Sequence, residues 1–211
     1  MAAASTLSLE KKTLAELGAD ELLRFPGSLD EYWDLAVQPE YRVDYQNGEI
    51  IAGMSYESAI HSDLVSELMY MLRQIFSKED YRFGNSNRPI AIPACGHAIF
   101  NPDGSVLNKG GAIYEYRPGM NAELEPILVF EVLSKTTRAR DWGEKLVCYK
   151  KIPTVQHILY VDSEALEVHL FKRVEGAAQW LETIYTEREA VLELSDKAIP
   201  LAAIYEGTLE G

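Results

Sequence analysis

Two apolar segments separated by one helix constrain the fold of this chain more than any other feature. Residues 126–133 (PILVFEVL) and 155–162 (VQHILYVD) predict buried strands, and the segment from about 138 to 151 predicts a helix. A strand, a helix and a second strand joined by short connections favour a parallel pair with a right-handed crossover. Antiparallel hairpins are predicted on both sides. We therefore expect an α/β (α+β) fold in which a mixed β-sheet is flanked by helices.

The length and composition fit one globular domain. A chain of 211 residues can bury a sizeable core, and we expect a single domain over residues 28–211 after a loosely attached leader over residues 1–27. Ser28 suits the N-cap of the first helix, because its hydroxyl can accept an early backbone N–H. Asn47-Gly48 lies between two alternating segments and is typical of a two-residue hairpin. Hydrophobic residues make up 47%, which excludes collagen-like and disordered classes.

The net charge is unusual for a protein that binds nucleic acid. It is −13, from 20 basic and 33 acidic residues. Proteins that bind nucleic acid mainly through its phosphates are usually basic. Three explanations are open: the partner is not a polyanion, the binding is local, or a divalent cation offsets the carboxylates.

The sequence predicts a cytoplasmic protein. No apolar run reaches the roughly 18 residues that a membrane span needs, and no secretory signal is visible at the start. Cys95 and Cys148 are too few for a disulfide framework and lack the spacing of metal ligands, which fits a reducing compartment.

Glu131 interrupts an otherwise apolar strand. An ionised carboxylate in a dry strand is costly unless a charge, a metal or several donors meet it. Because alternate side chains of a strand share a face, Glu131 is expected to lie with Val129 and Leu133. It lies near the C-terminal end of its strand, the edge at which open α/β sheets form sites. The structural alternative is an ion pair with Arg138 or Arg140.

Two more polar residues allow a functional or a structural interpretation. Asp103 lies between Pro102 and Gly104, and considered alone this tripeptide favours a surface turn. Lys145 lies on the helix after the Glu131 strand, and considered alone it is a solvated lysine. An acid after proline, an acid in an apolar strand and a lysine on the next helix, in this order, favour a site instead.

This order of residues resembles the PD-(D/E)XK nuclease superfamily, and more narrowly its Uma-type family of "putative restriction endonucleases". That family has a PD element, an EVLS strand end followed by threonine, and a D-x-G-x-K-x-x-x-Y helix. The matching residues here are Pro102, Asp103, Glu131, Val132, Leu133, Ser134, Thr136, Asp141, Gly143, Lys145 and Tyr149. The resemblance spans about residues 30 to 207.

The resemblance implies a restriction-endonuclease-like fold and metal-dependent hydrolysis of DNA phosphodiester bonds. In that scheme Asp103 and Glu131 hold Mg²⁺ or Mn²⁺, together with the carbonyl group of Val132. The metal lowers the pKa of a bound water and offsets charge on the phosphate. Lys145 orients that water or stabilises charge on the phosphoryl oxygens. The resemblance also implies a homodimer with DNA as its partner, without membrane association.

Asp44 and His61 are possible auxiliary residues of the site. Acidic residues often occupy the position of Asp44 in the resembled family, and the alternative is an exposed strand carboxylate. His61 lies at the start of a predicted helix over 57–77, and the alternative is a satisfied core histidine. A local group of basic residues offers the best predicted contact with phosphates: Lys135, Arg138, Arg140, Lys150 and Lys151.

The sequence departs from the family pattern after Asp103. Gly104 and Ser105 interrupt what is an apolar strand in many relatives, which predicts a bulge or an early strand end. The 28 residues from Asp103 to Glu131 also suggest a loop around residues 115–125.

Three functional hypotheses follow from these observations. The first is a metal-dependent endonuclease, based on Asp103, Glu131 and Lys145. The second is a catalytically inactive module with the nuclease fold that binds nucleic acid or protein, favoured by the acidic balance and by the stretch after Asp103. The third is a structural or regulatory protein that acts through protein contacts, supported only by the acidic surface.

Overall fold

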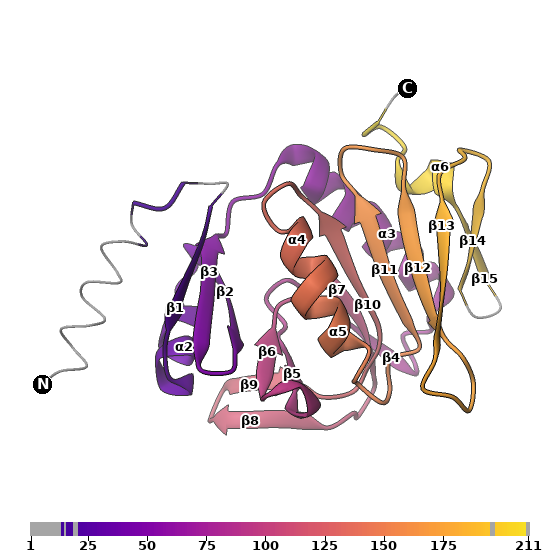
Figure 1. The fold of residues 1–211 in the computed structure, drawn as a ribbon. Coiled ribbons are helices and arrows are strands. Elements are labelled where there is room, and N and C mark those ends of the chain that lie inside the picture. The colour runs from indigo at the N-terminus through magenta and orange to yellow at the C-terminus, as the bar shows by residue number, and fades with distance from the viewer. Residues whose placement is uncertain (1–13, 15, 19–20, 195–196, 210–211) are drawn as a thin grey trace, which may run out of the picture.

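The computed structural model describes residues 14, 16–18, 21–194 and 197–209, and these form two large mixed sheets with helices against them (Figure 1). Sheet A has the strand order β1-β3-β2-β6-β5-β9-β8. Its strands are β1 (Leu22–Pro26), β2 (Tyr41–Gln46), β3 (Glu49–Met54), β5 (Ile90–Ile92), β6 (Ala98–Phe100), β8 (Ile113–Arg117) and β9 (Met120–Glu123).

Sheet B carries the predicted strand–helix–strand unit and has the order β13-β12-β11-β10-β7-β4. Its strands are β4 (Tyr81–Asn85), β7 (Gly104–Asn108), β10 (Pro126–Leu133), β11 (His157–Asp162), β12 (Val168–Arg173) and β13 (Trp180–Tyr185). Strands β10 and β11 are parallel, with Glu131 opposite Tyr160. They are apolar on both faces because both faces of the sheet are covered. The predicted fold class is confirmed.

The connection from β10 to β11 is one helical segment whose middle is widened. It consists of α4 (Arg138–Arg140), a π-helical stretch η2 (Asp141–Lys145) and α5 (Leu146–Tyr149). In Figure 1 this segment lies between the β1 to β3 strands and sheet B. It packs on the face of sheet B that carries Val129 and Leu133.

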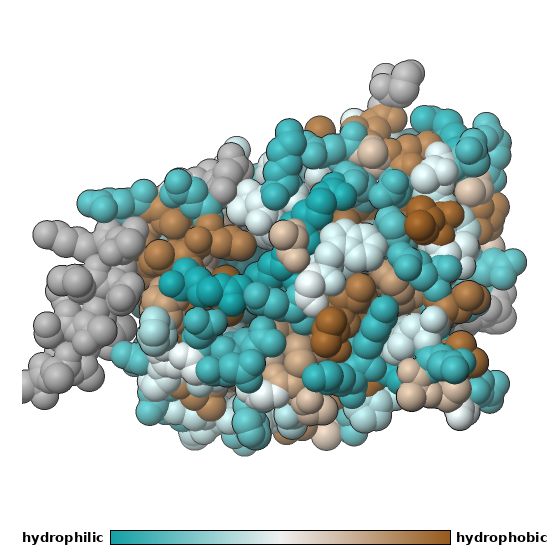
Figure 2. Space-filling model, in the orientation of Figure 1, coloured by the Kyte–Doolittle hydropathy of each residue, from teal (hydrophilic) through white to brown (hydrophobic). Residues whose placement is uncertain are grey.

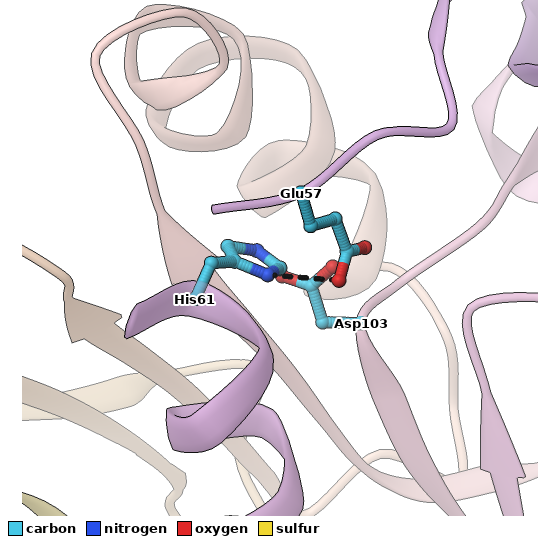
Figure 3. A group of neighbouring side chains, drawn as sticks. All are labelled: Glu57, His61 and Asp103. Atoms are coloured by element: carbon cyan, nitrogen blue, oxygen red, sulfur yellow. Dashed lines mark ion pairs between the residues drawn. The ribbon is translucent and has the colours of Figure 1, made fainter. Parts of the chain in front are cut away.

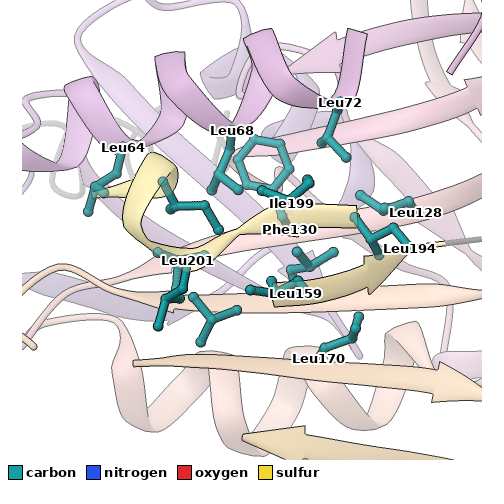
Figure 4. Packing of buried hydrophobic residues seen from close by; sticks show 14 of the residues in the cluster. Leu64, Leu68, Leu72, Leu128, Phe130, Leu159, Leu170, Leu194, Ile199 and Leu201 are labelled. Carbon is teal, nitrogen blue, oxygen red and sulfur yellow. The ribbon is translucent and has the colours of Figure 1, made fainter. Parts of the chain in front are cut away.

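The opposite face of sheet B packs on helix α3 (Ala59–Ile75) and on the C-terminal elements. Leu64, Leu68 and Leu72 recur every four residues on α3 and contact Phe130 and Val132 of β10 (Figure 4). The remaining elements of this layer are β14 (Val191–Leu194), β15 (Lys197–Pro200) and α6 (Leu201–Ile204). None of the helices among the described residues is both long and apolar enough to cross a membrane.

Local sequence rules hold in the first part of the domain. Helix α2 (Leu29–Ala36) begins with a capping box, in which Ser28 Oγ accepts from the N–H of Glu31 and Glu31 Oε2 accepts from the N–H of Ser28. Asn47 and Gly48 have φ values of 52° and 82°, as the predicted two-residue turn requires.

The leader predicted over residues 1–27 falls mostly outside the described residues. Its last part is in the sheet, since β1 pairs with β3 from Leu22 to Pro26 and Phe25 is buried. This pairing satisfies backbone groups that β3 would otherwise leave unpaired on its outer side.

Two expectations about the stretch after Asp103 are wrong. The strand does not end early, because β7 is five residues long and pairs with both β4 and β10. The register shift falls near Ile127 of β10 instead. Residues 115–125 are not a plain loop, because β8 and β9 form a hairpin around Gly119, whose φ is 83°.

A disulfide joins Cys95 and Cys148, a bond that the cysteine count did not anticipate. Cys95 ends the short 3₁₀ turn η1 (Pro93–Cys95) of sheet A, and Cys148 lies on α5. The bond therefore ties the helical segment to sheet A across 53 residues of sequence, with the two Cα atoms 5.5 Å apart.

Gly104→Ala should destabilise the fold. A Cβ at this position would meet Cε1 of Phe130 at 2.2 Å, so the ring or the strand must move. We expect a loss of about 1–3 kcal/mol in the free energy of unfolding, measured by urea denaturation. Gly143→Ala is the matched control: its Cβ meets nothing within 4 Å, and on a helical segment it should be neutral or stabilising. Equal effects of the two changes would contradict this packing.

Protonation of His157 should weaken the fold at acidic pH. Burial and the nearby Lys172 lower the pKa of His157 from 6.5 to about 4. Between these values the unfolded chain binds the proton and the folded chain does not, so stability is lost as the pH falls from 6.5 towards 4. The difference in unfolding free energy between the wild type and His157→Gln should therefore shrink as the pH falls, by up to about 1.4 kcal/mol per pH unit. A difference that is constant from pH 7 to 4.5 would contradict the assignment.

Candidate functional site

A cavity of about 170 Å³ lies between the two sheets, beside the helical segment. Its walls come from β2 and β3, the first turn of α3, the start of β7, the end of β10 and the helical segment. All of the predicted site residues line it: Asp44, His61, Asp103, Glu131, Val132 and Lys145. Figure 2 shows hydrophilic side chains between the β1 to β3 strands and the helical segment, next to apolar ones over β1 and β3.

Glu131 meets a cation and a hydroxyl inside the protein. Its Oε1 accepts from Lys145 Nζ at 2.9 Å and from the Tyr149 hydroxyl at 2.7 Å. Only 2% of Glu131 is exposed, and its side chain lies on the predicted face. Burial raises the pKa of Glu131 to about 7; Lys145 opposes this rise, whereas Asp141 and Asp103 add to it. The alternative pairing with Arg138 or Arg140 is wrong.

Asp103 is buried beside Glu131 and does not lie in a surface turn. Its Oδ2 accepts from the N–H of Val132 at 2.7 Å, and its own N–H donates to Glu131 Oε2 at 3.3 Å. Arg42 donates to Oδ1 of Asp103 at 2.6 Å. Burial opposes ionisation of Asp103, but Arg42 and His61 outweigh it and hold the pKa well below its usual value.

The π-helical stretch points two charged side chains inward. Asp141 and Lys145, four residues apart, are 1% and 4% exposed. Lys145 Nζ lies 3.3 Å from Asp141 Oδ1 and 3.8 Å from Asp44 Oδ2, in addition to its bond with Glu131. Burial alone would lower the pKa of Lys145, but these carboxylates raise it, so the ammonium group stays charged. Short π-helical insertions often occur at functional sites.

Asp44 belongs to the same ionic network. It pairs with Arg140, and its Oδ1 accepts from the N–H of Asn101 at 2.6 Å. Burial disfavours its charge, but Arg140 and Lys145 outweigh it and lower the pKa of Asp44. The alternative of an exposed strand carboxylate is therefore wrong.

His61 lies between two carboxylates (Figure 3). Its Nε2 is 3.2 Å from Asp103 Oδ2 and its Nδ1 is 3.1 Å from Glu57 Oε2. Burial by itself would lower the pKa of His61, but the hydrogen bonds to Asp103 and Glu57 raise it to about 10. At neutral pH the ring is therefore an imidazolium that orients Asp103.

The donor atoms of the cavity fit a divalent cation. Ligand atoms of Glu57, His61 and Asp103 all lie within 4.8 Å of one another, so these three side chains could hold a metal ion once the imidazolium of His61 has lost its proton, because only a neutral imidazole binds a metal. Glu131 is not a member of this group; its Oε2 accepts from the backbone N–H of Asp103. Carboxylate oxygens such as those of Asp103 and Glu131 are the donors that Mg²⁺ and Mn²⁺ prefer. In the structure the charges of these carboxylates are balanced by Arg42, His61 and Lys145, so a bound cation would compete with protein cations for the same oxygens.

The predicted basic group does not gather at the cavity. Arg138 pairs with Asp162, and Lys135 lies 2.8 Å from Glu164. Lys150 lies over the ring of Phe171. Of the five basic residues, Arg140 alone lines the cavity, where it neutralises Asp44.

Sequence reasoning missed Arg42 and Glu57, which both line the cavity. Arg42 lies two residues before Asp44 on β2, and that spacing places both side chains on one face of a strand. Glu57 lies four residues before His61, the spacing of neighbouring side chains at a helix start. Both spacings were available in the sequence, but neither shows by itself that the pair meets Asp103.

A double-mutant cycle should show that Glu131 and Lys145 stabilise each other. Lys145→Met leaves three buried carboxylates without their shared ammonium group and should cost about 3–5 kcal/mol of unfolding free energy. The double variant with Glu131→Gln should lose less than the sum of the single variants, by at least about 1 kcal/mol. Lys151→Met, at an exposed lysine, is the control and should have little effect. Additive losses would contradict a direct ion pair.

The chain is similar in sequence to one known family and to two proteins of a cyanobacterium. A model of the Uma2 family, described as "Putative restriction endonuclease", matches residues 29–200. Two uncharacterized proteins of Synechocystis sp., sll1609 and slr1290, are 28% and 29% identical over 165 and 187 residues. These matches cover 78% and 85% of this chain, and 90% and 92% of the relatives.

A solved structure shares the fold. It is the crystal structure of a "putative nuclease belonging to DUF820" from Anabaena variabilis, with a TM-score of 0.67 and 18% identity, and the match covers 87% of this chain and all of that one. The family match covers most of the chain and confirms the resemblance found in the sequence. This protein belongs to the Uma2 family of restriction-endonuclease-like proteins.

Proposed function

We propose that the protein is a metal-dependent endonuclease that hydrolyses phosphodiester bonds of DNA. One observation carries the proposal: Asp103, which directly precedes β7, Glu131 of β10 and Lys145 of the helical segment line one cavity. Four carboxylates of this cavity are buried, those of Asp44, Asp103, Glu131 and Asp141. Burying such a cluster is costly, and clusters of perturbed groups occur mostly at functional sites. Membership in the Uma2 family supports the same function.

In this proposal Asp103, Glu131 and the carbonyl group of Val132 hold Mg²⁺ or Mn²⁺. A bound ion of this kind supplies an activated water at neutral pH and neutralises charge on the phosphate. Val132 fixes Asp103 through its N–H, and Asp103 in turn approaches Glu131 through its own N–H. Asp103, the residue directly before β7, is therefore positioned by hydrogen bonds to β10, the strand that carries Glu131.

The cations of the cavity have separate tasks. Lys145 donates to the phosphoryl oxygens, which gain negative charge during hydrolysis, and its raised pKa keeps it charged for this purpose. Tyr149 holds Glu131 in place through its hydroxyl. His61 and Asp44 act as auxiliary residues: His61 orients Asp103, and Asp44 positions Lys145 and Arg140.

The alternative function is a catalytically inactive module that binds nucleic acid or protein. The balance of charges favours it, because Arg42, His61 and Lys145 already neutralise the carboxylates. A homodimer stays a prediction in both cases.

Nicking of plasmid DNA tests the proposal. With Mg²⁺ or Mn²⁺ the purified protein should cleave, and Glu131→Gln should reduce the rate by roughly 10³-fold because a charged ligand is lost. Asp63→Asn, at an exposed carboxylate of α3, is the matched control and should cleave normally. A chelator should stop cleavage.

Thermal unfolding gives a second readout that does not depend on activity. Mn²⁺ should raise the Tm of the wild type and of Asp63→Asn, but not that of Glu131→Gln or Asp103→Asn, since ligands that bind the folded state stabilise it. Cleavage that survives Glu131→Gln would overturn the mechanism. A wild type that binds DNA without cleaving it under either metal would support the inactive module.

A further inference from the structure

Two more cavities continue from the candidate site. Arg42 and Glu57 line both the site cavity and a second cavity of about 460 Å³. Arg88 lines this second cavity and also a third one of about 770 Å³ between α3 and β4, which we call the α3–β4 groove. Because neighbouring cavities share wall residues, the three cavities lie in series from Asp103 to the outer side of α3, and we call this series the path.

The walls of the α3–β4 groove are basic, although the protein is strongly acidic. Arg73, Arg82 and Arg88 line it, and none of its wall residues in the described part of the chain is acidic. This is notable in a chain with 33 acidic residues and a net charge of −13. A local positive surface on an acidic protein indicates a specific anionic ligand rather than general attraction to polyanions.

The arginines are held in place without losing their charge. Arg82 and Arg88 share the buried carboxylate of Glu123, with N–O distances of 2.8 to 3.0 Å, so the three groups together carry one excess positive charge. Arg73 lies over the ring of Phe83 at 5.3 Å and pairs with no carboxylate among the described residues. The groove therefore presents two net positive charges at fixed positions.

Aromatic and amide side chains accompany these charges. Tyr70 lines the α3–β4 groove and is 62% exposed, an uncommon state for a large ring. Asn87 and Asn121 line the middle cavity. Exposed rings beside arginines provide stacking surfaces for unpaired bases, and amides can hydrogen-bond the edges of bases.

We infer that the path from the site cavity to the α3–β4 groove binds a single polynucleotide strand several nucleotides away from the scissile bond. The inference rests on the proposed function and specifies its substrate: an unpaired strand, whose phosphates contact Arg88 and Arg73 and one of whose bases stacks on Tyr70. A duplex does not suit this path, because its bases are not available for stacking on an exposed ring.

Binding measurements in the Glu131→Gln background test this without cleavage. Fluorescence anisotropy with a labelled 20-nucleotide single strand should give tight binding that weakens with salt. Arg73→Gln should weaken binding several-fold at 50 mM NaCl and reduce the slope of log K against log [salt] by about 0.7. Tyr70→Ala should weaken binding by about tenfold without changing the slope, whereas Tyr70→Phe keeps the ring and should bind normally.

Matched controls separate the groove from general electrostatics. Lys151→Gln removes an exposed charge that follows α5, on the opposite face of sheet B, and should change neither affinity nor slope. Arg82 and Arg88 are not substituted, because removing them would leave the buried carboxylate of Glu123 without its partners. Thermal unfolding checks that Arg73→Gln and Tyr70→Ala remain folded. Unchanged binding by both variants, or equal losses for a blunt duplex, would overturn the inference.

A small substrate distinguishes this inference from the proposed function. Cleavage of a chromogenic phosphodiester that reaches only the site cavity should be unaffected by Arg73→Gln and lost in Glu131→Gln. Absence of cleavage of both this substrate and DNA by the wild type would refute the endonuclease, while salt-dependent strand binding through Arg73 would still support the path. Cleavage of DNA with no contribution from Arg73 or Tyr70 would refute the path alone.

Discussion

The buried ion pair between Glu131 and Lys145 is the interaction on which the arrangement of the cavity depends. A carboxylate inside an apolar strand can be accommodated only if a partner arrives from elsewhere in the chain, because water is excluded. The helical segment supplies that partner, and its π-helical turn brings Asp141 inward with the lysine. The position of the helical segment on sheet B therefore determines which charges in the cavity are neutralised.

The same requirement explains why the site lies between the two sheets. Sheet B contributes Asp103 and Glu131, while sheet A contributes Arg42 and Asp44 from a hairpin that packs across the helical segment. The disulfide from Cys95 to Cys148 ties the helical segment to sheet A. Each sheet alone would expose uncompensated charges, so the network favours their close approach, while the apolar clusters provide the stabilising area.

Predictions from local patterns were the most accurate. The N-cap at Ser28, the turn at Asn47-Gly48 and the strand over 126–133 depend on neighbouring residues, and all three are confirmed. The wrong predictions concern residues whose conformation depends on contacts with distant parts of the chain. Gly104 looked like an interruption of a strand, yet it is small because the ring of Phe130 lies against it, a residue 26 positions later in the chain. The hairpin around Gly119 gives only a weak strand signal in the sequence, because the residues of β8 are exposed or half-buried.

Strand alternation and motif order predict the family, the mixed fold and the face of β10 from which Glu131 points, because these patterns need no knowledge of distant contacts. Which charges meet depends on the folded arrangement of the chain. It paired Glu131 with Lys145 rather than with Arg138 or Arg140, brought Arg42 and Glu57 to Asp103, and assembled the arginines of the α3–β4 groove from separate elements. Ion pairs depend on separations of a few ångströms in space, and spacing along a chain specifies those separations only within one helix or strand.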